Sequence, residues 1–88
     1  MITKEYRILA ANGLHARPAT SLIRLARQFK SAIHVTKNEK RIPLQSMIGL
    51  LSLAIKHGDI LLVHIDGEDK LFAATQLDKF FNEDLQNL

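Results

Sequence analysis

Hydrophobic residues in this sequence follow two different periods that alternate along the chain, and their order limits the folds open to it. Alternation with a period of two predicts strands over residues 2–10, 32–37, 40–42 and 60–65. Spacings of three and four residues predict helices over residues 16–29, 47–53 and 71–85. Turn-forming residues separate most of these segments and the connections are short. The predicted order is therefore β-α-β-β-α-β-α.

This order predicts an α+β fold with a four-stranded, mostly antiparallel sheet. Three helices would cover one face of the sheet and leave the other face open to water, which antiparallel sheets tolerate. With 88 residues, the chain is expected to form a single domain over residues 1–88. A domain of this size has little room for an enclosed cavity, so a function carried on an exposed surface is favoured.

Composition excludes several classes of function. The chain has no cysteine, which removes disulfides, cysteine–zinc sites and thiol nucleophiles. Three of the four histidines, His34, His57 and His64, form no convincing zinc site, so we expect no metal. The chain has no Gly-x-x-x-x-Gly-Lys loop and no Gly-x-Gly-x-x-Gly turn, so we expect no cofactor either. The first residues lack the apolar core of a signal peptide. The longest uncharged apolar stretch, residues 47–55, is about half the roughly 18 residues of a membrane span. We therefore expect a cytoplasmic protein without stable membrane insertion.

The net charge of +3 is mildly basic, and its distribution says more than its sum. Basic residues are scattered, except for Arg17, Arg24 and Arg27 on one short segment. The chain has no run of lysine and arginine and few aromatic side chains, which disfavours nucleic-acid binding. A small basic RNA-binding or interaction module remains an alternative from another class, although no Gly-x-x-Gly signature supports it.

The segment 12–19, NGLHARPA, is the most informative in the chain. It places His15 where a turn, made possible by Gly13, meets the start of a helix. The first amides of a helix lack internal acceptors and, with the helix dipole, form an anion site. Arg17 adds a guanidinium that binds phosphate oxygens in pairs. A neutral histidine ring nitrogen is nucleophilic near neutral pH, so His15 is a candidate phosphoryl acceptor. Alternatively, His15 is a helix cap or an ordinary surface residue.

A second group of candidates follows at residues 46–51. Ser46 is placed to cap a short helix, where a phosphate would also be favourable. Met47, Ile48 and Leu51 belong to a two-turn helix that cannot bury every side, so they predict an exposed apolar patch of the kind that marks a protein interface. The alternatives are a plain cap for Ser46 and a core position for the three apolar residues.

Three polar residues on the helix over 16–29 are further candidates. Arg24 and Arg27 are expected on its solvent face, where an ordinary charged surface is the default. Thr20 lies about one turn beyond His15. It joins the same surface or is an ordinary exposed residue.

Two segments resemble signatures of the HPr family, the histidine-containing phosphocarriers of the bacterial phosphoenolpyruvate-dependent sugar phosphotransferase system. Residues 13–19, GLHARPA, are similar to the family's active-site motif, and residues 44–53, LQSMIGLLSL, to its regulatory-serine segment. Chain length, element order and the spacing of the two motifs also match. Two motifs at the family's spacing are more specific than one.

The resemblance implies an open-faced β-sandwich and a carrier rather than a free-standing catalyst. His15 would accept phosphate on Nδ1 from phosphorylated Enzyme I and pass it to a sugar-specific Enzyme II A domain. Arg17 would contact the phosphate, and Ser46 would be the site of an HPr kinase/phosphorylase. The partner-docking surface would comprise Thr20, Arg24, Arg27, Met47, Ile48 and Leu51. Within it, Arg24 and Arg27 would steer the protein toward acidic partner surfaces. We expect a monomer.

The sequence departs from the family pattern at three positions. Gln45 replaces a frequent lysine, and Glu39 and Ala54 replace common glycines, the first in a hairpin and the second after the second helix. None of the three touches the expected phosphoryl chemistry. A regulatory HPr-like paralogue of the nitrogen-related branch, signalling through its phosphorylation state, remains the alternative within the family.

Overall fold

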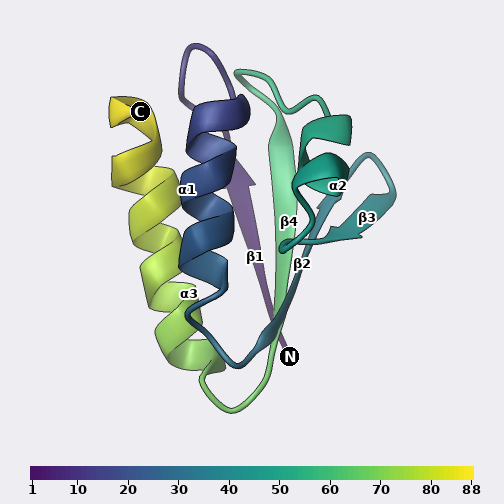
Figure 1. Cartoon of the computed structure of the whole chain (residues 1–88), viewed down its shortest axis with the longest axis vertical. Coiled ribbons are helices and arrows are strands. Elements are labelled where there is room, and N and C mark those ends of the chain that lie inside the picture. Colours follow the sequence, from purple (N-terminus) through teal and green to yellow (C-terminus); the bar gives the residue numbers. More distant parts are fainter.

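The elements follow one another in the predicted order (Figure 1). The computed structural model describes residues 1–88. Its strands and helices are β1 (Ile2–Arg7), α1 (Ala16–Ala26), β2 (Ala32–Lys37), β3 (Lys40–Pro43), α2 (Met47–Ser52), β4 (Ile60–Asp66) and α3 (Lys70–Lys79), and the chain ends in a π-helical turn (Phe80–Asp84) and a 3-10 turn (Leu85–Asn87). None of the helices combines the length and the apolar composition needed to cross a membrane.

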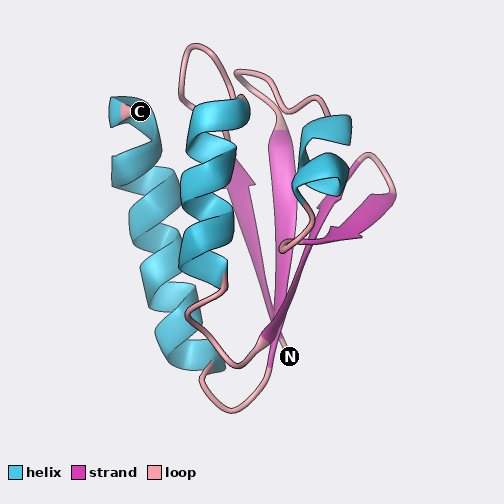
Figure 2. Cartoon of the chain, in the orientation of Figure 1, coloured by secondary structure: helices cyan, strands magenta, loops and turns pink.

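The four strands form one antiparallel sheet in the order β1-β4-β2-β3. Alternation along β4 buries Leu61, Val63 and Ile65 completely, because successive side chains of a strand point to opposite faces. The helices cover the face that carries these residues (Figure 2). The other face is left without a helix, so the predicted α+β open-faced β-sandwich is confirmed.

Two element ends were predicted too far along the chain. The strand predicted over 2–10 ends at Arg7, because the amide of Ile8 donates to the Asp59 carbonyl, outside the strand ladder, at 2.8 Å. The helix predicted over 16–29 ends at Ala26, and Phe29 follows in a turn. Ile8 and Phe29 are nevertheless buried, so the hydrophobic pattern continues past the end of each element.

The helix predicted over 71–85 changes its winding at Phe80. A π-helical turn holds one more residue than an α-helical turn and therefore shifts the face that later side chains present. Phe80 and Phe81 are adjacent in sequence yet both are buried, and the Phe81 ring stacks on Tyr6 with centroids 4.4 Å apart. The π-helical turn allows both rings to be buried, and a regular period of 3.6 residues does not predict it.

Three non-glycine residues adopt left-handed backbone conformations. Asn38 and Glu39 have φ angles of 49° and 71° and form the two-residue turn between β2 and β3. Positive φ at both central positions is the geometry that a tight hairpin turn requires. Ala54, just after α2, has a φ of 49°. Two of these residues, Glu39 and Ala54, stand where glycine is common in HPr proteins, and the backbone conformation that favours glycine is retained.

Asp69 connects the start of α3 to the turn between α1 and β2. Its carboxylate accepts hydrogen bonds from the backbone amides of Lys30 and Ser31, at 2.8 and 2.9 Å, and from the Ser31 hydroxyl. The Ser31 hydroxyl first, and the Lys30 amide next, lower the pKa of Asp69 below its ordinary value of 3.8. The charged form is thus favoured in the folded protein.

Acid should weaken the fold through Asp69. Because its folded pKa is lowered, its contribution to stability is fully present above pH 3.8 and is lost as the pH falls through the folded value. Thermal melting followed by circular dichroism between pH 2 and pH 7 should show a smaller drop in Tm for Asp69→Asn than for the wild type. Asp66→Asn, at an exposed carboxylate, is the control and should keep the wild-type profile. An unchanged acid profile in Asp69→Asn would refute this role.

Candidate functional site

His15 stands at the N-cap of α1 with its side chain exposed. Its backbone is extended, with φ −78° and ψ −175°, and its carbonyl accepts from the Ala19 amide at 2.9 Å. The imidazole makes no capping hydrogen bond. Since Pro18 has no N–H, the amides of Ala16 and Arg17 are the free donors at this helix end. The ring is therefore accessible and lies beside unpaired backbone donors.

Two backbone hydrogen bonds and one buried side chain fix the loop before His15. Gly13 has a φ of +64° and is buried, and its amide donates to the Ala10 carbonyl at 3.0 Å. Leu14 inserts its side chain into the core, and its amide donates to the Ile55 carbonyl at 3.1 Å. The backbone that presents His15 is thus held by a segment about 40 residues further along the chain.

Arg17 lies in the first turn of α1 and is exposed. Every ion pair in the protein uses a lysine or the N-terminus, so the guanidinium of Arg17 has no carboxylate partner. A free guanidinium close to open amides can bind an anion without first breaking a salt bridge. His15 and Arg17 come together at one helix end, as expected, and their roles there stay predictions.

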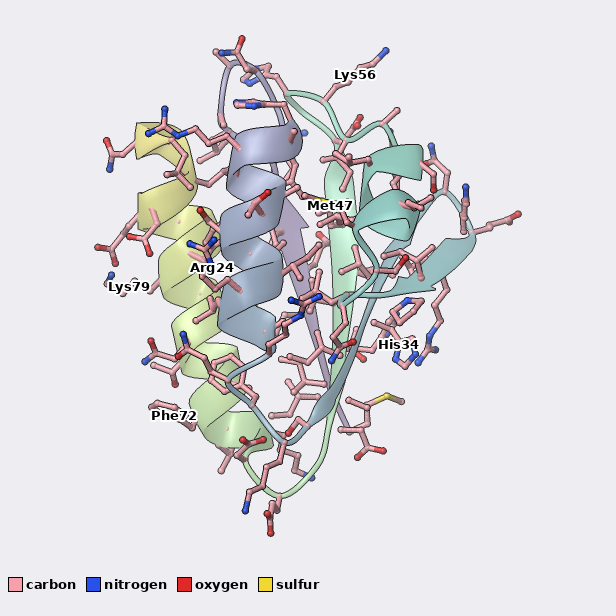
Figure 3. The ribbon with its side chains drawn as sticks, in the orientation of Figure 1. Arg24, His34, Met47, Lys56, Phe72 and Lys79 are labelled. Carbon is pink, nitrogen blue, oxygen red and sulfur yellow. The ribbon has the colours of Figure 1, made fainter.

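A shallow groove between α1 and α2 collects four of the predicted docking residues. Its volume is about 180 Å³, and it is lined by Thr20, Ile23, Arg24, Arg27 and Met47. Figure 3 labels Arg24 on α1 and Met47 at the start of α2. Both arginines are exposed and unpaired. The Thr20 hydroxyl donates to the Ala16 carbonyl at 2.9 Å.

The short helix α2 continues this surface. Ser46 is its N-cap, and its hydroxyl accepts from the Gly49 amide at 3.0 Å. Ile48 is 85% exposed and Leu51 is 41% exposed, whereas Met47 packs partly against the core. The expected apolar patch on α2 is therefore present, and the alternative in which all three residues are buried is wrong.

Two features of this surface were not predicted from the sequence. Ile23 is a buried core residue that also lines the groove. The basic residues are also less scattered than expected, because residues 6–58 carry nine arginines and lysines and one acidic residue, Glu39. That charge count was the available signal, since the site residues lie within this basic part of the chain. No three histidine, aspartate or glutamate side chains are close enough to share a metal ion.

Comparisons with known proteins agree with this geometry. Residues 2–83 match the family model described as the PTS HPr component phosphorylation site. Over 77 residues the chain is 40% identical to the phosphocarrier protein HPr of Haemophilus influenzae, covering 88% of this chain and 91% of the relative.

Solved structures give the same result. The crystal structure of a phosphocarrier protein HPr from Bacillus anthracis superposes with a TM-score of 0.86 at 30% identity, covering 91% of this chain and 95% of that one. An HPr from Thermoanaerobacter tengcongensis, described as a dimer, gives a TM-score of 0.75 at 32% identity, with 92% and 95% covered. With the fold, the motif around His15 and these matches in agreement, the chain belongs to the HPr family of phosphocarriers of the phosphotransferase system.

Proposed function

We propose that this protein carries a phosphoryl group on His15 from phosphorylated Enzyme I to sugar-specific Enzyme II A domains. The observation that carries the proposal is the exposed, unbonded imidazole at the N-cap of α1, next to free amides and to Arg17. A shallow site of this kind stabilises the phosphoryl oxygens while leaving the group open to the next acceptor. The protein would act as a carrier rather than a free-standing catalyst.

The proposed transfer is a displacement at phosphorus. With the ring proton on Nε2, the lone pair of Nδ1 attacks, and a P–N bond forms while the bond from phosphorus to the donor atom of Enzyme I breaks. The Arg17 guanidinium and the amides at the start of α1 would bind the phosphoryl oxygens. In the second transfer a nucleophile of the acceptor attacks phosphorus, the P–N bond breaks, and its electron pair returns to Nδ1, which restores the neutral ring.

The direct test is incubation with phosphoenolpyruvate and Enzyme I. An acid-labile phosphate on this protein is the expected result, and a protein that stays unlabelled would contradict the proposal. Labelled protein is then offered to sugar-specific and to nitrogen-specific A domains. Faster transfer to the sugar-specific acceptors supports the proposal, and faster transfer to the nitrogen-specific ones favours the regulatory paralogue.

We propose that Arg24 and Arg27 speed encounter with acidic partner surfaces. The double variant Arg24→Gln/Arg27→Gln should slow labelling by Enzyme I about tenfold at low salt, and the difference should shrink as salt rises, because steering between exposed charges is screened. The control, Arg7→Gln/Arg41→Gln, removes the same charge from two other exposed, unpaired arginines. Equal slowing in both double variants would contradict a role specific to this surface.

We also propose Ser46 as a regulatory phosphorylation site of an HPr kinase/phosphorylase. Its hydroxyl oxygen already lies at the N-terminus of α2, where negative charge is favourable. Next to the exposed Ile48 and Leu51, the same charge would repel an acidic partner. The kinase and ATP should label the wild type and not Ser46→Ala, which should lose about 1 kcal/mol of stability with the cap. Equal labelling of both proteins would exclude Ser46.

We further propose that residues 1–88 act as one HPr-like domain and as a monomer. The single cluster of 25 buried hydrophobic residues supports the first point. A carrier that exchanges phosphate between these partners would work in the cytoplasm. Sedimentation at several concentrations tests the monomer, and a dimer at working concentration would contradict it.

A further inference from the structure

Lys37, the last residue of β2, makes three polar contacts with the segment that follows α2. The Lys37 ammonium donates to the carbonyls of Leu53 and Ala54, at 2.9 and 2.8 Å, and pairs with the Asp59 carboxylate at 2.8 Å. Its side chain is only 15% exposed. An ammonium has three protons, and each has an acceptor here. Lys37 is therefore fully bonded in a largely buried position.

These contacts hold both ends of the segment 53–59. The two carbonyls begin the segment and the carboxylate of Asp59 ends it. Asp59 also accepts from the Lys56 amide at 2.7 Å, and the Lys37 hydrogen bond first, and this amide next, lower its pKa below the ordinary value. The Asp59 carboxylate therefore stays ionised at neutral pH. Lys37 and Asp59 together close the segment into a clamped loop.

The middle of the segment supports the active-site backbone. The Ile55 carbonyl accepts from the amide of Leu14, the residue directly before His15. Ala54 directly precedes Ile55, and its carbonyl is one of the two that Lys37 binds. Its backbone has the left-handed conformation that disfavours any residue with a side chain. Lys37 thus binds a strained residue next to the one that supports Leu14.

We propose that Lys37 is a positioning residue for phosphoryl transfer. By clamping the segment 53–59 it holds the Ile55 carbonyl, and through the Leu14 amide it fixes the backbone direction from which the His15 ring projects. The inference rests on the proposed role of His15. It is specific to a chain with alanine at position 54, since glycine would adopt this conformation without being held.

The test is the single-turnover rate of phosphoryl transfer from phosphorylated Enzyme I. Lys37→Met should slow it about tenfold, because small displacements of a reacting group are costly. Lys40→Met is the matched control: it removes the same charge from a lysine whose ammonium donates to the Ser52 hydroxyl of α2, at 3.0 Å. It should stay within about twofold of the wild type. All rates are measured at a temperature where circular dichroism shows each variant folded.

A rescue variant separates positioning from general stability. Ala54→Gly alone should change the rate less than about twofold, because the wild-type loop is already held. The double variant Lys37→Met/Ala54→Gly should accept phosphate at least about three times faster than Lys37→Met. Hydrogen exchange should show faster exchange of the Leu14 amide in Lys37→Met, and slower exchange again in the double variant. If Lys37→Met does not fold, Asp59→Asn removes the ion pair alone and should slow transfer severalfold.

Three results would overturn the inference. They are equal rates for Lys37→Met and Lys40→Met, an unchanged exchange rate of the Leu14 amide in Lys37→Met, and no recovery in the double variant. A wild-type protein that accepts no phosphate at all would instead refute the proposed function, so the two failures are distinguishable.

Discussion

Replacement of His15 by alanine is expected to abolish phosphoryl acceptance from Enzyme I, a loss of roughly a thousandfold or more in initial rate. The free amides of α1 and Arg17 can bind phosphate, but neither supplies a nucleophile. The fold should be almost unaffected, because the imidazole is exposed and makes no capping hydrogen bond. The measurement is transfer of labelled phosphate from phosphoenolpyruvate, with circular dichroism on the same sample.

The matched control is His34→Ala. His34 lies on β2, on the sheet face that no helix covers, and is placed apart from α1 in Figure 3. This variant should accept phosphate at the wild-type rate. Label on His15→Ala approaching that of the wild type would mean that another residue carries the group, and so would loss of label in His34→Ala alone.

Gly13→Ala should unfold the loop before His15 and lower the free energy of unfolding by at least about 3 kcal/mol. The φ angle at Gly13 is +64°, which strains any side chain, and an added Cβ would lie 2.8 Å from the Lys56 Cα and nearer still to the Ile55 carbonyl oxygen. Both contacts are backbone and cannot rotate away. For a domain of this size the expected drop in Tm is about 12 °C or more.

Gly58→Ala isolates the backbone contribution to this effect. Gly58 also has a positive φ, +88°, but an added Cβ would meet no atom within 4 Å. It should therefore cost only about 1 kcal/mol. Similar melting temperatures for the two variants would show that the close approach of Gly13 to residues 55 and 56 is unimportant.

Local patterns were sufficient for much of the fold. The alternation of Leu61, Val63 and Ile65 requires nothing beyond neighbouring residues, and neither does Ser46 as a cap before an apolar run. The exposure of Ile48 followed from the same kind of reasoning, because a two-turn helix has too many apolar residues to bury. These predictions are confirmed.

The remaining features depend on contacts distant in sequence. The π-helical turn at Phe80 lets the next residue, Phe81, stack on the Tyr6 ring. The early end of β1 goes with the hydrogen bond from the Ile8 amide to the Asp59 carbonyl. The contacts of Lys37 could not be predicted from the end of its strand, because its three acceptors lie 16 to 22 residues further along the chain. The substitutions at Glu39 and Ala54 were visible in the sequence, but only the fold shows what holds Ala54 in place.

Nuclear magnetic resonance of the ¹⁵N-histidine-labelled protein after reaction with phosphoenolpyruvate and Enzyme I tests the central claim most directly. The proposal predicts a phosphorus coupling at one ring nitrogen of one histidine, Nδ1 of His15, which disappears when the sample is acidified or an Enzyme II A domain is added. A coupling on His34, His57 or His64, or an acid-stable phosphate with no histidine coupling, would contradict it.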